Sequence, residues 1–310
     1  MSTHSFELPP AKEYAPYQPG PFRLAMDLHP LNLAEWIEVD EHLPAELAEK
    51  QRLLAERHHE VFAALPEAAA GAAETLALLV DHLPARFPQV YQLEGDRLHN
   101  RATAETWPLA GGRMHPLELA GRLVQEDLCL MGRDPASGLY RLTGACLCFP
   151  SRWRLAEKLG KPLDAIHGPV PGYAAALGAP MNRLFERLKS HKPVWRLNWS
   201  VVDDPALFQP IAPAGPDYAT NVTAANAGDK LWLRLERQTL RRLAASNDIL
   251  FTIRIYSRPL SVLAGQPERA AQLAAAIRGL NEEMRLYKSM RPIIGAALAW
   301  LDRTAAAGCG

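Results

Sequence analysis

The sequence lacks a surplus of charge of either sign. Its 310 residues include 34 Lys and Arg against 34 Asp and Glu, so the formal net charge is zero. Proteins that bind nucleic acids or anionic membranes through long-range electrostatics carry a clear basic surplus. The composition therefore predicts neither a nucleic acid nor a membrane surface as a partner.

Long hydrophobic runs are also missing. No apolar run reaches the roughly 18 residues that a membrane-spanning helix needs. The first 21 residues, MSTHSFELPPAKEYAPYQPGP, contain no basic region followed by an apolar core, which a secretory signal peptide requires. These two features predict a cytoplasmic protein.

Cysteine is scarce, and its spacing indicates no framework. Cys129, Cys146, Cys148 and Cys309 show neither a disulfide pattern nor a zinc-binding spacing, and they are too few together to hold an iron–sulfur cluster. The chain also has no GxGxxG after a strand and no Walker loop. A pyridine nucleotide used in any redox reaction of this protein is therefore expected to bind elsewhere.

The most informative stretch is 124–173. Two apolar runs flank a Gly-Arg-Asp-Pro turn and predict a β-hairpin, which ends at Pro150. Ser151 is a suitable N-cap for a short helix that Gly160 closes. A second helical turn then leads to His167 within Ile-His-Gly-Pro-Val-Pro-Gly, where a rigid loop could present the imidazole to a cavity.

Three later segments alternate with the period of β-strands, at 193–202, 230–239 and 249–256. If these strands are neighbours, the sheet has one apolar face and one polar face. The polar face is predicted to carry Arg196, Asn198, Arg234, Glu236 and Arg254. Two explanations remain open: a solvated face of an antiparallel sheet, or a pocket floor where guanidinium groups meet carboxylates and a carboxylate meets a cation.

Several motifs in this order resemble the haem-dependent oxidative N-demethylase alpha-subunit-like family. The motifs are QEDLCLM, FPSRW, EKLGKPLDAIHGPVPGY, RLNWS and RLERQTLRRL, and the resemblance extends from about residue 22 to about residue 260. It implies an α+β fold in which a PAS-like antiparallel sheet and short helices enclose a haem pocket. The expected organisation is an extended arm over 1–21, a mostly helical cover over 22–120, the haem-binding core over 121–260, and a C-terminal helix and tail over 261–310.

The same resemblance suggests roles for individual residues. His167 is the predicted axial ligand of the haem iron, with His191 as the second choice. The other predicted cofactor-binding side chains are Arg196, Asn198, Arg234, Arg254 and Tyr173. Glu236 is the predicted carboxylate that binds a cationic amine, with Glu126 or Asp127 as alternatives.

The activity implied is removal of a methyl group from a small secondary alkylamine, such as dimethylamine, with haem b and dioxygen. Electrons are expected from NADPH through a separate reductase subunit or a ferredoxin-type donor that carries flavin or an iron–sulfur cluster. Two other interpretations remain open at this point: a non-catalytic haem-PAS sensor or binding protein, and a homologue without haem whose pocket is filled by side chains. The sequence leaves the particular amine open.

Overall fold

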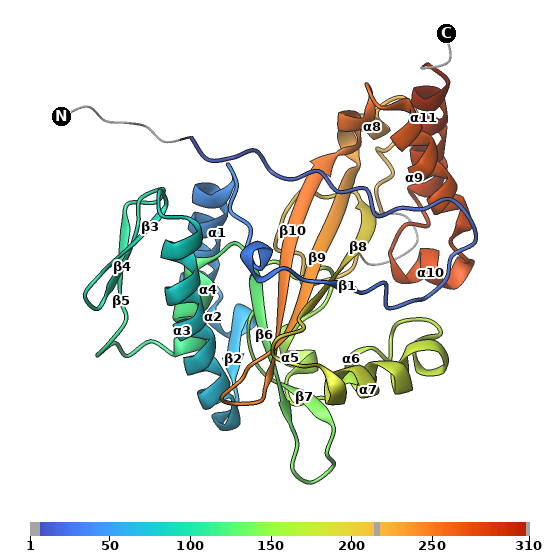
Figure 1. The fold of residues 1–310 in the computed structure, drawn as a ribbon. Helices are drawn as coiled ribbons and strands as arrows, with labels where there is room; N and C mark the ends of the chain where they lie inside the picture. Colours follow the sequence, from blue (N-terminus) through green and yellow to red (C-terminus); the bar gives the residue numbers. More distant parts are fainter. Residues whose placement is uncertain (1–6, 214–217, 308–310) are drawn as a thin grey trace, which may run out of the picture.

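The computed structural model describes residues 7–213 and 218–307, and it confirms the α+β class. A seven-stranded antiparallel sheet runs through the molecule, and helices lie on both of its faces (Figure 1). No helix in the described residues combines the length and the hydropathy needed to cross a membrane. Cys309 and the first six residues lie outside the described ranges.

The large sheet has the strand order β1-β8-β9-β10-β6-β7-β2. Its members are β1 (His29–Pro30), β2 (Phe62–Ala64), β6 (Asp127–Arg133), β7 (Tyr140–Cys146), β8 (Val194–Val202), β9 (Trp232–Arg242) and β10 (Ile249–Pro259). The chain therefore forms two strands, β6 and β7, then crosses over through short helices, and then adds β8, β9 and β10. The last of these returns to pair with β6.

The hairpin predicted around 124–149 is confirmed as β6 and β7. Its turn is built by Asp134, whose carboxylate accepts hydrogen bonds from the Ser137 amide at 3.1 Å and hydroxyl at 2.6 Å. Gly138 follows with a φ of +74°, a conformation that favours glycine. A register shift between Leu130 and Met131 bends the pair, as β-bulges do.

The segment expected to be a mostly helical cover also contains strands. Phe62–Ala64 continues the helical pattern in sequence, but it forms β2 because it pairs with the open edge of β7. A separate three-stranded sheet lies farther along the chain, with β3 (Tyr91–Glu94), β4 (Arg97–Asn100) and β5 (Glu105–Pro108). The helical elements here are η1 (Leu33–Glu35), α1 (Leu43–Glu56), α2 (His58–Val61), η2 (Pro66–Ala68), α3 (Ala69–Arg86) and α4 (Pro116–Leu123).

The crossover between β7 and β8 consists of short helical elements. They are α5 (Leu155–Lys158), α6 (Leu163–Ile166), η3 (Ala174–Gly178) and α7 (Ala179–Arg187). Met181 and Phe185 on α7 belong to the same hydrophobic cluster as Ile253 and Ile255 on β10, so these helices cover one face of the sheet. We call this face the site face.

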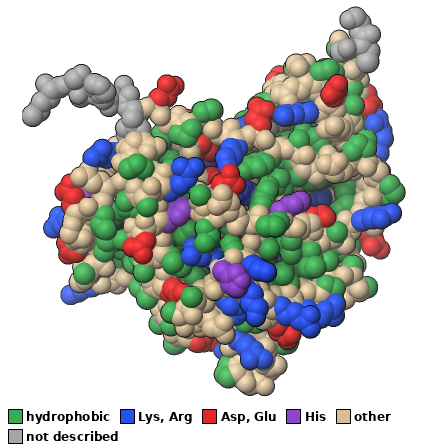
Figure 2. Space-filling model, viewed as in Figure 1, with side chains coloured by type: hydrophobic (Ala, Val, Ile, Leu, Met, Phe, Trp, Pro, Cys, Tyr) green, Lys and Arg blue, Asp and Glu red, His purple; other side chains and the backbone are tan. Residues whose placement is uncertain are grey.

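The other face is covered by two groups of helices and is called the network face. The N-terminal helices pack on one half of it. On the other half lie α8 (Ala227–Lys230), η4 (Leu260–Leu263), α9 (Pro267–Gly279), α10 (Glu282–Tyr287) and α11 (Ile294–Ala306). Figure 1 shows the two groups as separate lobes on either side of the long strands, and Figure 2 shows the notch between these lobes at the top of the same view.

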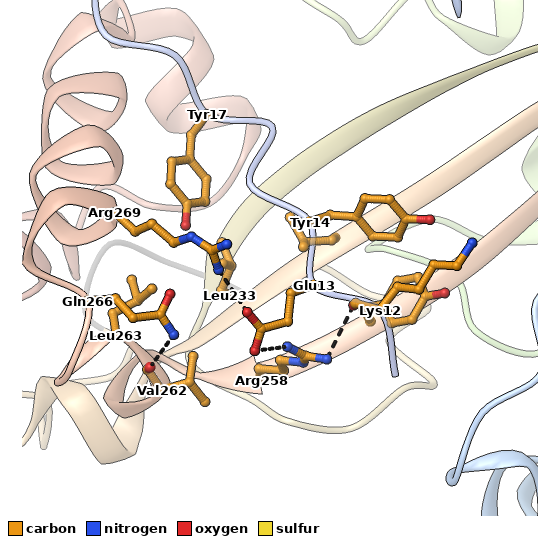
Figure 3. Close-up of a pocket in the computed structure, with 12 residues that line it drawn as sticks. Lys12, Glu13, Tyr14, Tyr17, Leu233, Arg258, Val262, Leu263, Gln266 and Arg269 are labelled. Atoms are coloured by element: carbon orange, nitrogen blue, oxygen red, sulfur yellow. Dashed lines mark hydrogen bonds and ion pairs between the residues drawn. The ribbon is translucent and has the colours of Figure 1, made fainter. Parts of the chain in front are cut away.

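The N-terminal arm crosses the long strands and fastens to the C-terminal helices. Glu13 pairs with Arg258 at 3.3 Å and with Arg269 at 2.8 Å, and both contacts are drawn in Figure 3. Farther along, the Phe22 amide donates to the Gly279 carbonyl at 3.0 Å. The cavity between the arm and η4 has a volume of about 20 Å³, which is room for a water molecule and not for a cofactor.

Register determines which side chains share a face, because residues directly opposite each other in a sheet point to the same side. Arg196 lies opposite Gln238, and Asn198 lies opposite Glu236, so the predicted polar face is correct for β8 and β9. Ile255 lies opposite Glu236, whereas Arg254 lies opposite Arg237. The alternation of β10 is therefore reversed relative to the prediction, and Arg254 belongs to the network face.

Candidate functional site

His167 lies at the end of α6, on a loop that packs beneath the site face. Its Nδ1 is 2.9 Å from the Leu163 carbonyl oxygen. A carbonyl can only accept, so Nδ1 carries the proton and the lone pair of the ring is on Nε2. The imidazole stacks on Tyr173, with ring centroids 4.6 Å apart and planes inclined by 14°. The neutral ring is thus fixed in the tautomer that leaves Nε2 available as a ligand.

The surroundings of His167 keep it uncharged at neutral pH. Burial lowers its pKa below the ordinary value, and the nearby cations Lys158 and Arg196 lower it further. The hydrogen bond to the Leu163 carbonyl has the opposite, smaller effect. A metal binds neutral imidazole, so this environment suits a ligand more than a general acid.

Two basic side chains near His167 have no counter-ion within ion-pair distance among the described residues. The Nε of Arg196 is buried and has no hydrogen-bond partner there. Lys158 places its ammonium group 4.0 Å from the centre of the Trp153 ring, and burial lowers its pKa to about 8. Both residues are partly exposed, and an anionic partner would stabilise each of them, because a partly buried cation without one is costly.

Glu236 on β9 is the carboxylate of the site face. It accepts hydrogen bonds from Gln238 at 2.7 Å and from Asn198 at 3.3 Å, and it forms no ion pair with a described residue. Burial alone would raise its pKa, but the Ser151 hydroxyl and the positive charges of Arg234 and Lys288 outweigh it, so the pKa is lowered. Glu236 is therefore ionised at neutral pH.

Side chains on the site face are partly accessible in the middle of the sheet. On β9, Glu236 and Gln238 are partly exposed, although both neighbours on the network face, Leu235 and Arg237, are buried. Phe251 on β10 is partly exposed as well. β9 and β10 are interior strands of the sheet, so the crossover helices do not fully cover the site face here.

Lys288 reaches this region from a distant part of the chain. It follows α10, and its Nζ donates to the Trp199 carbonyl at 2.5 Å and to the Asn198 side-chain oxygen at 3.3 Å. Burial lowers its pKa to about 8, which the nearby Glu236 partly counteracts. Asn198 therefore links a carboxylate on one side to an ammonium group on the other.

Arg234 points to the site face, as predicted, but its guanidinium is already engaged. It donates to the Phe149 carbonyl at 3.0 Å, to the Leu207 carbonyl at 2.8 Å and to the Ser151 hydroxyl at 3.0 Å. Only 1% of the residue is exposed. The role of Arg234 in this structure is to join the end of the hairpin to the 203–209 loop.

The prediction that Arg254 binds the cofactor is not supported by its position. Arg254 lies on the network face and contacts none of the other predicted site residues. Its guanidinium pairs with Asp40 at 2.7 Å and with Glu46 at 2.6 Å, both from the N-terminal cover. The prediction placed it with Arg234 because both alternate with apolar neighbours. Alternation gives the period of a strand and not its register against the next one.

The second-choice ligand and the alternative carboxylates are not part of this group of residues. His191 is exposed and lines an open cleft of about 530 Å³ near the β9–β10 turn. Glu126 is fully buried and accepts from the Glu38 amide at 3.0 Å. Asp127 is also buried, and its carboxylate caps the Cys148 and Phe149 amides at 2.8 Å each. The structure therefore brings together His167, Tyr173, Arg196, Asn198 and Glu236.

Three residues of this region were missed by the sequence analysis: Ser151, Lys158 and Lys288. Ser151 and Lys158 belong to motifs that were singled out, so a search for polar side chains within those motifs could have found them. Lys288 lies 90 residues from Asn198. No local pattern near Lys288 indicates this contact.

The fold is thus an antiparallel sheet with one partly exposed face, beside which lie a neutral imidazole and two cations that form no ion pair with a described residue. The sequence matches the family described as haem-dependent oxidative N-demethylase, alpha subunit-like, over residues 27–298. The match covers nearly the whole chain. The protein belongs to this family, which confirms the resemblance noted in its motifs.

Proposed function

We propose that this protein binds haem b through His167 and oxidatively removes a methyl group from a small secondary alkylamine. The observation that carries the proposal is the His167 imidazole, with Nδ1 held by the Leu163 carbonyl and Nε2 left without a hydrogen bond to a described residue. In histidines that bind a metal through one ring nitrogen, a hydrogen bond from the other ring nitrogen orients the imidazole. One imidazole suits an iron whose in-plane ligands belong to a macrocycle.

The order of secondary structure supports a PAS-like core. Two strands, a crossover of short helices and three further strands occur in that order, and the short helices cover one face of the resulting sheet. This is the arrangement that PAS domains use to enclose a ligand. The accessible centre of the site face counts against a pocket filled by side chains.

Arg196 and Lys158 fit the anionic groups of a haem. Both are cations near His167, and both have no ion pair within the described ranges. Haem propionates are carboxylates, which guanidinium and ammonium groups bind well when water is excluded. Arg196 and Lys158 would therefore hold the propionates, in place of the earlier candidates Arg234 and Arg254.

When bound, the haem supplies the oxidation of the N-methyl group, with dioxygen and electrons from a separate reductase or ferredoxin-type donor. The protein supplies position and charge. Glu236, oriented by Asn198 and Gln238, offers an ionised carboxylate to an alkylammonium group. A cation placed there would be held on the site face.

The test begins with haem binding. Purified protein is reconstituted with haem, and the Soret band is compared between wild type, His167→Ala and His191→Ala. We expect His167→Ala to lose the wild-type spectrum and to retain haem poorly, while His191→Ala matches wild type. A wild-type spectrum in His167→Ala would overturn the ligand assignment.

Turnover is then measured as formaldehyde released from dimethylamine in air. NADPH, a ferredoxin and a ferredoxin reductase are added together and then omitted one at a time. We expect formaldehyde only with the complete set. A protein that binds haem and shows no turnover with any donor would be a haem-binding or sensor protein, which would overturn the demethylase proposal.

A further inference from the structure

Lys288 sits on a linker that is held firmly at the rim of the site. The residue after it, Ser289, has a φ of +52°, which is unusual for a residue other than glycine. The Ser289 carbonyl accepts from the Tyr218 hydroxyl and from Arg152 at 3.4 Å. Arg152 is in turn paired with Asp203 at 2.9 Å. Strained backbone that its neighbours hold in place is concentrated at functional sites.

The side chain of Lys288 runs from this rim towards the sheet. Its ammonium group contacts the Asn198 amide oxygen and the Trp199 carbonyl, and it lies 5.5 Å from the centre of the Trp199 ring. The Asn198 amide nitrogen donates to Glu236. One asparagine thus connects the ammonium group of Lys288 with the carboxylate of Glu236.

Several charged groups lie near the ammonium group of Lys288. Glu236 attracts it and Arg196 repels it, both from the sheet. The neighbouring Tyr287 on α10 also senses the charge of Glu236, which raises the pKa of its phenol after the larger effect of burial. The rim adds Arg152, Asp203 and Tyr218, of which the first two neutralise each other. Glu236 is therefore shared between Lys288 and any cation that enters.

An entering alkylammonium ion would add a further positive charge beside Glu236. Unless a charge leaves, it meets the ammonium group of Lys288, and the two like charges repel each other. Arg196 cannot give up its proton near neutral pH, because guanidinium groups stay charged. A lysine can, since its pKa falls readily on burial.

We propose that Lys288 releases its proton to solvent when an alkylammonium ion binds beside Glu236. The inference rests on the proposed function, because it takes the ligand to be an amine. The balance is simple: one ammonium ion enters, the Lys288 ammonium group becomes an amine, and the proton passes to water at the rim. The net charge of the site stays the same.

The low pKa of Lys288, about 8, brings this release within reach of neutral pH. Most of the Lys288 population is protonated at pH 7, so binding should release close to one proton per amine. By linkage, amine affinity should rise with pH, by up to about tenfold per pH unit below pH 8, and level off above it. A site whose charge did not change would bind the amine equally well from pH 6.5 to 8.

The experiment measures proton release when dimethylamine hydrochloride is titrated into the haem-loaded ferric protein. Calorimetry in two buffers of different ionisation enthalpy gives the number of protons, and the Soret response gives the affinity. We expect about one proton released at pH 7 and almost none at pH 9.5. Amine binding without proton release at pH 7 would overturn the inference and leave the proposed function intact. No amine binding at any pH would overturn both.

Two variants show whether the released proton comes from Lys288 or from the amine. Lys288→Met has no proton to lose and no charge, so it should bind the amine with a flat pH profile, more tightly than wild type at pH 6.5, and release none. Lys288→Arg keeps a permanent charge, so it should bind more weakly and also release none. A full proton released by Lys288→Arg would mean that the amine itself is deprotonated, which contradicts the inference. Lys192→Met, on the exposed turn before β8, is the matched control and should behave as wild type.

Discussion

The two faces of the large sheet use the same residue types in opposite ways. On the network face, Arg254 is paired with Asp40 and Glu46, and Arg237 donates to the Trp36 carbonyl at 3.2 Å. On the site face, Arg196 and Lys158 have no counter-ion among the described residues. Buried charges that are paired with opposite charges hold elements together, whereas Arg196 and Lys158 are not used in this way.

The network face joins distant segments through shared carboxylates. Glu38 accepts from Tyr14 at 2.7 Å and from the Tyr256 hydroxyl, and it pairs with Lys12 at 2.6 Å. These contacts tie the arm, the N-terminal cover and β10 together. Substitutions on the two faces should therefore have separable effects: stability on the network face, and ligand binding on the site face.

The largest effect is expected for Arg254→Met. Removing the guanidinium leaves Asp40 and Glu46 buried without their cation, and breaking such a pair costs about 3–5 kcal/mol. Urea unfolding followed by circular dichroism measures this loss, and Arg269→Met, which removes an exposed pair with Glu13, should cost less than about 1 kcal/mol. The fraction of Arg254→Met that stays folded should bind haem as wild type does. A stable variant with weakened haem binding would place Arg254 in the site after all.

Arg234→Met should have the next largest effect. It leaves the Phe149 and Leu207 carbonyls without their donor, at about 1–3 kcal/mol for each buried group left unsatisfied. Because Arg234 orients Ser151 and the 203–209 loop, this loss should appear as faster proteolysis of that loop in addition to lower stability. Unchanged stability, together with a large loss of haem, would show that the guanidinium binds the cofactor directly.

Arg196→Met should affect haem binding and leave stability unchanged. Since Arg196 has no ion pair with a described residue, its loss should leave the free energy of unfolding of the haem-free protein unchanged or slightly higher. Haem affinity should fall by about tenfold, which corresponds to ~1.4 kcal/mol. Competition with apomyoglobin for haem measures the affinity. Wild-type haem retention in this variant would remove Arg196 from the cofactor site.

An effect of similar size is expected for Glu126, a buried carboxylate on the network face. One of its carboxylate oxygens is buried without a hydrogen bond, and burial raises its pKa to about 7. The folded protein then holds a proton that the unfolded chain loses near pH 4.5, so this group lowers stability as pH rises towards 7. Glu126→Gln should therefore gain about 1–2 kcal/mol relative to wild type between pH 5 and pH 8. Parallel pH profiles for the two proteins would contradict the assignment.

Much of this fold could be predicted from local pattern. The β6–β7 hairpin, the strand segments β8 to β10 and the loop that carries His167 follow from alternation and from turn residues. The face of Arg254 could not be predicted, because the register of β10 against β9 depends on pairing across the sheet. Lys288 could not be predicted either, since its contact with Asn198 arises only after the C-terminal helices pack. The strands of the β3–β5 sheet are short and alternate only weakly, so this sheet could not be recognised within a segment whose other elements are helices.

The N-terminal arm has a consequence for how the protein is made. The arm is synthesised early, but its partners come late: Arg258 holds the Ala11 carbonyl at 2.8 Å, and Gly279 accepts from the Phe22 amide. On the ribosome, the first segment must therefore wait until most of the chain has emerged before it can dock. During that interval Tyr14 and Tyr17 have nothing to pack against. Docking of the arm is therefore a late step of folding, after β10 and α9 have formed.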